Sequence, residues 1–193
     1  LQELEEQGTA VVLTEKDVKN AGMDGVFADG FRGAYEGICC LVEKGCKKIT
    51  IILGQPEMDA VTEERYRGCL QALEDNGISG AEKMVLREAE DLSRVFQGKK
   101  LPDAFFALNQ IAADQCIREL FKCKKVGTEK IIFMGMDAEN TAQVLGDEMI
   151  SVEKDRRKQG KEAVKLLLEA FDAEENDRIR GKRIMIPYKV TGV

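Results

Sequence analysis

The chain has 193 residues, which is enough for one large domain or for two small lobes. Its 29 Lys and Arg residues are outnumbered by 35 Asp and Glu residues, and the formal net charge is −6. A nucleic-acid-binding surface needs an excess of basic residues to displace counterions from phosphates, so the composition argues against direct contact of this chain with DNA or RNA. No stretch approaches the roughly 18 consecutive apolar residues of a membrane helix.

The first residues have the pattern of a helix that is already under way. Residues 1–7 resemble the tail of a helix, and residues 10–13 resemble the strand after it. A helix without a preceding strand is unusual in an alternating α/β architecture. We therefore expect an N-terminal part of the parent protein to precede Leu1, with a genuine short N-terminal helix as the alternative.

Strand-like and helix-like segments then alternate along the chain. The strand-like segments lie at residues 25–28, 47–53, 104–108, 131–134 and 183–190, and most of them are rich in apolar residues. The helix-like segments have apolar residues at helical spacing, at residues 34–42, 66–73, 113–121 and 164–171. Pro187 in the last run favours an edge strand or a strand end. This alternation predicts βαβ units and a mostly parallel sheet, and therefore an α/β fold. Residues 172–177 are the most polar short stretch and are expected to form an exposed helix end and loop.

Histidine is absent, and the cysteines do not have the spacing of metal ligands. The six cysteines are Cys39, Cys40, Cys46, Cys69, Cys116 and Cys123, and none forms a C-x-x-C pair. A metal site therefore has little support, and no cofactor is expected. Most of these residues fall on apolar helix positions, so we expect buried free thiols, which favour a reducing compartment and hence the cytoplasm.

Four polar residues follow predicted strands at equivalent positions. Asp29, Asn109 and Asp137 come just after strand-like runs, and Arg65 lies early in the helix after another. In open parallel sheets, ligands bind beyond the carboxyl ends of the strands. A carboxylate accepts hydrogen bonds from hydroxyls, a guanidinium offers a fork of donors, and an amide does both. These four residues therefore predict a site for a small hydroxylated or amide-bearing molecule.

Each of the four residues also has a purely structural interpretation. Asn109 and Asp29 could cap the helices that follow them. Arg65 could form a surface ion pair with a neighbouring glutamate, and Asp137 could order its own loop. The weight of the prediction therefore rests on the coincidence of four such residues at equivalent positions.

Motifs of catalysis are missing from the sequence. It contains neither a G-x-x-x-x-G-K-[ST] phosphate loop nor a G-x-S-x-G nucleophile elbow, and its glycines do not form G-x-G-x-x-G. Without histidine, the commonest general base is unavailable. A carboxylate pair of Asp137 and Glu139 could do acid–base work, but these residues are better explained as polar loop groups. We therefore expect a binding protein rather than an enzyme.

Several motifs together resemble those of LacI-type transcription regulators. They are Gly33-Ala34-Tyr35, the run 41–49 (LVEKGCKKI), the run 65–73 (RYRGCLQAL), the run 102–109 (PDAFFALN), Gly135-Met136-Asp137, and the segment from Ser151-Val152 through Gly160 to residues 163–168. They occur in the family's order from about residue 8 to residue 190.

The resemblance implies the type I periplasmic-binding-protein-like fold, in which two α/β lobes hinge around a small molecule such as a sugar or nucleobase. It places residues 1–45 and 150–179 in an incomplete first lobe. Residues 46–149 and 180–193 then form the second lobe. By the same resemblance, Arg65, Asn109 and Asp137 contact the effector, and Asp29 lies at the cleft.

The sequence departs from the family pattern at several points. Cys46 replaces a histidine, and Ala138 replaces a second aspartate that is common after Asp137. The family's opening strands and its DNA-binding helix-turn-helix are not in this chain. We therefore expect residues 1–193 alone to bind an effector weakly or not at all, a prediction that micromolar binding in calorimetry would contradict.

The leading functional prediction is the effector-binding core of a cytoplasmic transcription regulator. Such a core would form a homodimer by default and reach DNA only through a domain outside this chain. One alternative is the ligand-sensing domain of a signalling protein with a kinase or cyclase domain, and another is an extracytoplasmic sugar-binding protein. The identity of the ligand and the direction of its effect on DNA binding are not predicted.

Overall fold

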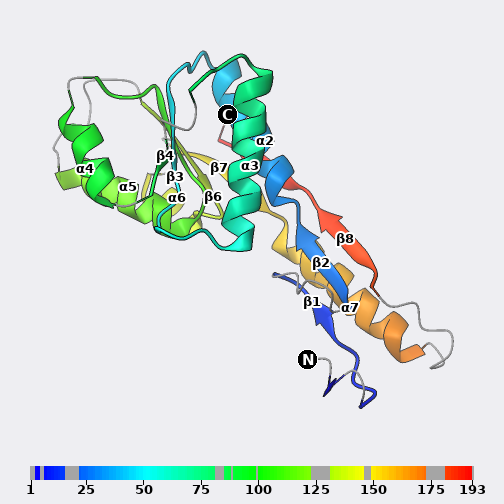
Figure 1. Ribbon diagram of the computed structural model, residues 1–193. Helices are drawn as coiled ribbons and strands as arrows, with labels where there is room; N and C mark the ends of the chain where they lie inside the picture. The colour runs from blue at the N-terminus through cyan, green and yellow to red at the C-terminus, as the bar shows by residue number, and fades with distance from the viewer. Residues whose placement is uncertain are drawn as a thin grey trace. The chain divides into compact units, whose positions relative to one another are not determined.

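The computed structural model describes residues 3–4, 7–15, 22–80, 85–87, 89–98, 100–122, 131–145, 149–172 and 181–192 (Figure 1). Strands and helices alternate along the chain, which confirms the predicted α/β class. The chain divides into two compact units. Unit 1 contains residues Leu1–Asp29 and Lys154–Tyr188, and unit 2 contains Gly30–Glu153 and Lys189–Val193.

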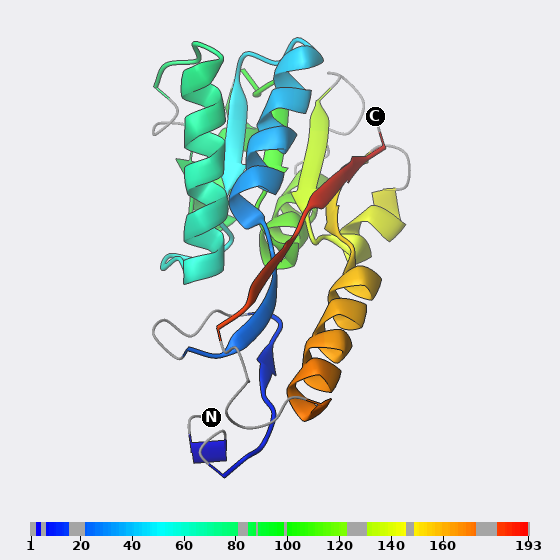
Figure 2. The same cartoon turned by 90° about the vertical axis from the view of Figure 1, so that its right-hand side faces the viewer.

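Unit 1 is a small parallel sheet with one helix. Strands β1 (Val12–Leu13), β2 (Asp24–Ala28) and β8 (Arg183–Ile186) pair in the order β1-β2-β8, all in parallel. Helix α7 (Arg156–Asp172) packs on these strands, as Figure 2 shows. Buried apolar side chains from both layers form the core of the unit, namely Val26, Ala163, Leu166 and Ile186.

A buried glutamine ties α7 to the strands of unit 1. The side-chain amide of Gln159 donates to the carbonyl oxygens of Val26, at 3.0 Å, and of Thr14. The residues of α7 buried against the sheet are Gln159, Ala163 and Leu166, at helical spacing. The more apolar stripe noted in the sequence lies mostly on another face, because Val164, Leu168 and Phe171 are exposed in this structure.

Unit 2 contains a six-stranded sheet of order β4-β3-β5-β6-β7-β9. Its strands are β3 (Ile49–Ile52), β4 (Val85–Leu86), β5 (Ala104–Ala107), β6 (Ile132–Met136), β7 (Met149–Lys154) and β9 (Tyr188–Thr191). Its helices are α2 (Gly30–Glu43), α3 (Ala60–Asp75), α4 (Ala89–Gln97), α5 (Gln110–Lys122) and α6 (Glu139–Leu145). Strands β4, β3, β5, β6 and β7 are parallel to their neighbours, as predicted. Strand β9 follows Pro187 and lies at the edge of the sheet, as the proline indicated.

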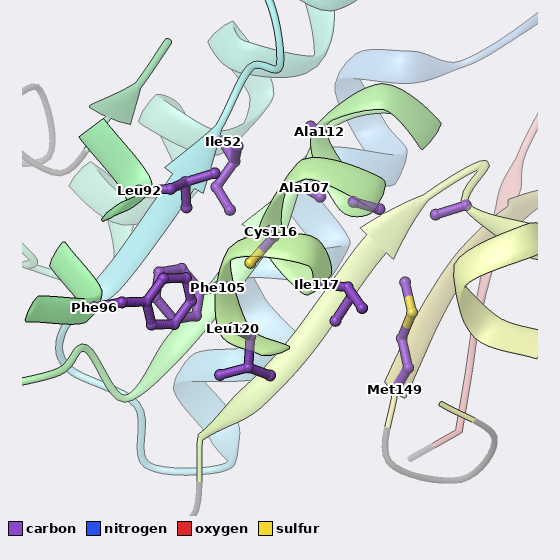
Figure 3. Close-up of a cluster of buried hydrophobic side chains, with 12 residues drawn as sticks. Ile52, Leu92, Phe96, Phe105, Ala107, Ala112, Cys116, Ile117, Leu120 and Met149 are labelled. Atoms are coloured by element: carbon purple, nitrogen blue, oxygen red, sulfur yellow. The ribbon is translucent and has the colours of Figure 1, made fainter. Parts of the chain in front are cut away.

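One core cluster of unit 2 lies between the sheet and helices α4 and α5 (Figure 3). The ring of Phe105 on β5 lies 5.0 Å from that of Phe96 on α4 and 5.7 Å from that of Phe133 on β6, measured between centroids. Cys116 on α5 is buried in the same cluster. Strands β3 and β5 are wholly buried, which explains why they are predominantly apolar.

Helix α2 belongs to unit 2 because it packs closely on α3 and on the sheet. An added Cβ at Gly68 of α3 would lie 2.1 Å from the carbonyl oxygen of Phe31 on α2. An added Cβ at Gly37 of α2 would lie 2.8 Å from the ring of Phe106 on β5. Both glycines therefore allow contacts that a side chain would block.

The two units differ from the lobe boundaries expected from the sequence. Residues 30–45 were expected in the first lobe, but α2 packs within unit 2. Strand β8 was expected in the second lobe, but it pairs with β2 in unit 1. The chain returns from unit 2 to unit 1 after Glu153, whereas the sequence placed this return before residue 150.

The cysteines within the described residues are free thiols, as expected. Cys46, Cys69 and Cys116 are buried, and Cys39 and Cys40 are partly buried. Burial raises the pKa of the Cys69 and Cys116 thiols, so both remain protonated and unreactive near neutral pH. Cys123 lies outside the described residues, as do residues 173–177 of the expected polar loop and part of the expected N-terminal helix. None of the described helices is long and apolar enough to cross a membrane.

Asp103 joins the starts of two strands and gives a prediction for pH dependence. Its carboxylate accepts hydrogen bonds from the backbone amides of Lys47 and Lys48, both at 2.8 Å, and these bonds lower its pKa. Because the pKa is lowered in the folded protein, these hydrogen bonds stabilise the fold fully at any pH above the pKa of an unfolded aspartate, which is about 4. The stabilisation is lost as the pH falls through the lower pKa that Asp103 has in the folded protein. Because the carboxylate is exposed, we expect Asp103→Ala to lower the free energy of unfolding by only about 1 kcal/mol at neutral pH.

Urea unfolding of the wild type and Asp103→Ala between about pH 7 and pH 3 measures this effect. The difference between the two proteins should shrink as the pH falls. Asp103→Asn serves as the control, because it keeps an acceptor oxygen but cannot titrate. A difference that is constant over the whole pH range would contradict the assignment.

Candidate ligand-binding site

The candidate site of unit 2 lies at the carboxyl ends of β3, β5 and β6. These strands are parallel neighbours, so their ends meet at one edge of the sheet. Arg65, Asn109 and Asp137 come from the segments that follow the three strands. Hydrogen bonds of these side chains connect the segments to one another. The fourth predicted residue, Asp29, lies in unit 1.

Arg65 bridges two of these segments from a buried position on α3. Only 5% of its surface is exposed. Its Nη1 donates to the carbonyl oxygen of Leu108 at 2.6 Å, and its Nη2 donates to Oδ2 of Asp137 at 2.5 Å. Gly30 makes room for it, since an added Cβ there would lie 3.2 Å from Cγ of Arg65. Arg65 is therefore a buried, charge-paired residue and not an exposed surface arginine.

Asp137, which comes directly after β6, has an unusual backbone conformation. Its φ is 48°, in the left-handed region that aspartate tolerates better than most residues. Its amide donates to the carbonyl oxygen of Val152 at 3.0 Å, which anchors the turn to β7. The side chain, 12% exposed, points its Oδ2 to Arg65. The turn thus orders Asp137, whose side chain is largely buried and whose Oδ1 atom is buried.

The residues beside Asp137 explain the Gly-x-Asp-Ala sequence. An added Cβ at Gly135 would lie 2.4 Å from Cε of Met149 and 2.8 Å from Cβ of Ala138. Ala138 is itself buried in the core cluster of unit 2. A second aspartate at position 138 would place a carboxylate in this packed region, so its replacement by alanine removes a charge and fits the packing.

Asn109 uses both ends of its amide in the structure. Its Oδ1 accepts from the backbone amide of Ala112 at 2.8 Å, which caps α5. Its Nδ2 donates to the carbonyl oxygen of Leu53 at 2.9 Å, at the end of β3. Asn109 thus joins the β3 and β5 segments, and the capping interpretation holds. Its contact with a ligand stays a prediction.

Asp29 is the last residue of unit 1 before the chain enters unit 2. Its backbone amide donates to the carbonyl oxygen of Ile186 at 2.9 Å, which extends the pairing of β2 with β8. It directly precedes the first residue of α2, Gly30. Its role toward a ligand also stays a prediction.

The sequence reasoning missed two groups of polar residues. In unit 1, the ammonium of Lys154 contacts both carboxylate oxygens of Glu15 at 2.8 Å, with the Lys154 side chain only 8% exposed. In unit 2, three side chains form a closed hydrogen-bonded cluster between α5 and α6, namely Gln110, Asp114 and Thr141. The i, i+4 spacing of Gln110 and Asp114 was the one available sequence signal.

Comparison with known proteins identifies related domains. The family model of the periplasmic binding protein-like domain matches residues 39–191. The HTH-type transcriptional repressor PurR of Haemophilus influenzae (strain PittGG) is 30% identical over an alignment of 159 residues, and the match covers 78% of this chain and 46% of that protein. The NTD biosynthesis operon regulator NtdR of Bacillus subtilis (strain 168) is 27% identical over 169 residues, covering 84% of this chain and 50% of that protein. The chain therefore spans about half the length of these relatives.

Solved structures have the same fold. A LacI family transcriptional regulator from Enterococcus faecium with bound ribose superimposes with a TM-score of 0.79, covering 97% of this chain and 71% of that one. The sequence identity is 19%, so this likeness supports the fold and not a shared ligand.

Proposed function

The chain belongs to the periplasmic binding protein-like domain family, and we propose that it is the effector-binding core of a LacI-type transcription regulator. Its curated relatives PurR and NtdR are transcription regulators rather than enzymes. We place its DNA contacts in a helix-turn-helix domain outside residues 1–193, because the net charge of −6 disfavours phosphate contacts by this chain. We also propose that the regulator is a homodimer and that it acts in the cytoplasm.

The observation that carries the binding proposal is the buried pair of Arg65 and Asp137. A guanidinium that is already ordered presents its donors in a fixed direction, so little side-chain entropy is lost when an oxygen-bearing ligand arrives. The carboxylate of Asp137 is of the chemical kind that accepts hydrogen bonds from hydroxyl or N–H groups of a ligand. We therefore propose a sugar or nucleobase-like ligand, with Asn109 and Asp29 as further contacts.

The proposed mechanism is a shift between two arrangements of the protein. A ligand that binds one arrangement more tightly raises the population of that arrangement by its differential affinity. The DNA-binding domains would respond to this change in population. No covalent chemistry is needed, which agrees with the absence of catalytic motifs from the sequence.

We expect Arg65→Lys to weaken ligand binding by the full-length protein about tenfold or more, because lysine keeps the charge but loses the planar fork. Calorimetry with D-ribose, other sugars and free nucleobases measures the affinity. Arg32→Lys is the matched control, since Arg32 lies in an exposed pair with Glu36 on α2. Equal affinities of the wild type and Arg65→Lys would argue against the role of Arg65.

The link to transcription is tested separately, by the intact mass and N-terminal sequence of the protein from its native cell. A basic helix-turn-helix before Leu1 would support the regulator. A cleaved signal peptide would favour an uptake protein instead. A large catalytic domain after Val193 would favour a signalling protein.

A further inference from the structure

Helix α6 starts immediately after Asp137 and has little apolar surface to hold it in place. It comprises seven residues, too few to be stable by itself in water. Thr141 is its one fully buried residue, while Ala142 and Leu145 are only partly buried and Val144 is exposed. The position of α6, and of the turn that leads into it, must therefore depend strongly on polar contacts.

The cluster of Gln110, Asp114 and Thr141 supplies these contacts. The side-chain amide nitrogen of Gln110 donates to Oδ1 of Asp114 at 2.7 Å and to Oγ1 of Thr141 at 2.9 Å. The hydroxyl of Thr141 donates to the same Asp114 oxygen at 2.8 Å. The amide oxygen of Gln110 accepts from the backbone amide of Asn140 at 3.1 Å. Both hydrogens and the oxygen of the Gln110 amide are thus engaged, which fixes its orientation.

This cluster connects the same two segments that Arg65 connects. Gln110 directly follows Asn109 at the end of β5, and Thr141 lies four residues after Asp137 at the end of β6. Arg65 joins these segments through Leu108 and Asp137. Two separate sets of hydrogen bonds therefore hold the β5 and β6 segments together, and helices α5 and α6 are neighbours in Figure 1.

We infer that Gln110, Asp114 and Thr141 are positioning residues for the ligand site. They fix the start of α6 against the start of α5, and so hold the left-handed turn at Asp137 in the geometry that pairs it with Arg65. This inference rests on the proposed function in so far as ligand affinity depends on that pairing. Its structural part, the coupling of the cluster to the Asp137 turn, does not depend on any ligand.

The test compares Thr141→Val with Ser93→Ala. Valine has the shape of threonine but lacks the hydroxyl, so it breaks the cluster with little change in packing. The hydroxyl of Ser93 on α4 donates to the carboxylate of Glu119 on α5 at 2.5 Å. Ser93→Ala therefore also removes a hydroxyl-to-carboxylate hydrogen bond on α5, but at a place away from the cluster. Thr141→Ser keeps the hydroxyl and should restore the wild-type behaviour.

Two measurements are made on the full-length protein. The first measurement is amide hydrogen exchange, with the rates corrected for the global stability of each variant. We expect the backbone amides of Asp137 and Asn140 to exchange about tenfold faster in the Thr141→Val protein than in the Ser93→Ala protein. In calorimetry with the sugar or nucleobase that binds the wild type, we expect affinity to fall about tenfold in Thr141→Val and to be unchanged in Ser93→Ala and Thr141→Ser.

Equal protection of Asp137 in the Thr141→Val and Ser93→Ala proteins would overturn the inference, as would equal ligand affinity or a failure of Thr141→Ser to restore it. If the wild type binds none of the probes, the proposed function fails, and hydrogen exchange at Asp137 still decides whether the cluster positions the turn. The two failures are therefore distinguishable.

Discussion

Gly68→Ala is expected to destabilise the protein by about 3 kcal/mol or more, the upper part of the range for overpacked sites. The new Cβ would lie 2.1 Å from the carbonyl oxygen of Phe31, well inside van der Waals contact. The atom it meets is backbone of α2, so a simple change of side-chain rotamer cannot relieve the overlap. Helices α2 and α3 would have to move apart, which would disturb the packing that positions Arg65.

Gly160→Ala is the matched control for this prediction. Gly160 also lies within a helix, α7, but an added Cβ there has no atom within 4 Å. Alanine should therefore stabilise the protein by about 0.5–1 kcal/mol through helix propensity alone. Thermal or urea unfolding of both variants measures the two effects. Changes of the same sign in both variants would show that the contact between α2 and α3 is less close than the structure indicates.

Arg65→Met is expected to lower the free energy of unfolding by about 3–4 kcal/mol, because it leaves the carboxylate of Asp137 buried without its cation. The carbonyl oxygen of Leu108 loses its donor as well. In an Asp137→Asn background a neutral amide replaces the carboxylate, and asparagine tolerates the left-handed φ of 48° found at this position. The same Arg65→Met change should then cost only about 1–2 kcal/mol.

A double-mutant cycle on these two residues isolates their interaction. Urea unfolding of the wild type, the two single variants and the double variant gives four free energies, and a coupling of about 1–3 kcal/mol is expected for a charged pair in contact. Additive effects would mean that Arg65 stabilises the fold through its other contacts. The cycle uses unfolding only, so its outcome does not depend on the identity of the ligand.

Much of the fold could be predicted from the sequence because the inner strands β3 and β5 of unit 2 are buried on both faces. Burial makes β3 and β5 predominantly apolar, and this pattern is visible in the sequence without any knowledge of the structure. The site residues could be located because parallel strands bring their carboxyl ends to one edge. The pairing of Arg65 with Asp137 could not be predicted, since it joins residues 72 positions apart.

The misplaced features have a common physical cause. The sequence shows which residues are apolar but not which neighbour covers them. Helix α2 was therefore assigned to the wrong unit, although Gly37 and Gly68 are the residues that let it approach the sheet and α3. On α7, a polar residue, Gln159, faces the strands because backbone carbonyls there accept its hydrogen bonds. Hydrophobicity alone predicts the opposite orientation.

The division of the chain has a consequence for the order of synthesis. Strands β1 and β2 belong to unit 1, but their partners β8 and α7 come only after the whole of residues 30–153. At about 5–20 residues per second, a ribosome would need on the order of ten seconds to complete unit 1 after β2 has emerged. During that time β2 lacks its neighbour on one side, whereas the main segment of unit 2 can already pack. A chaperone that shields an open strand edge would therefore help the first thirty or so residues of this sequence most.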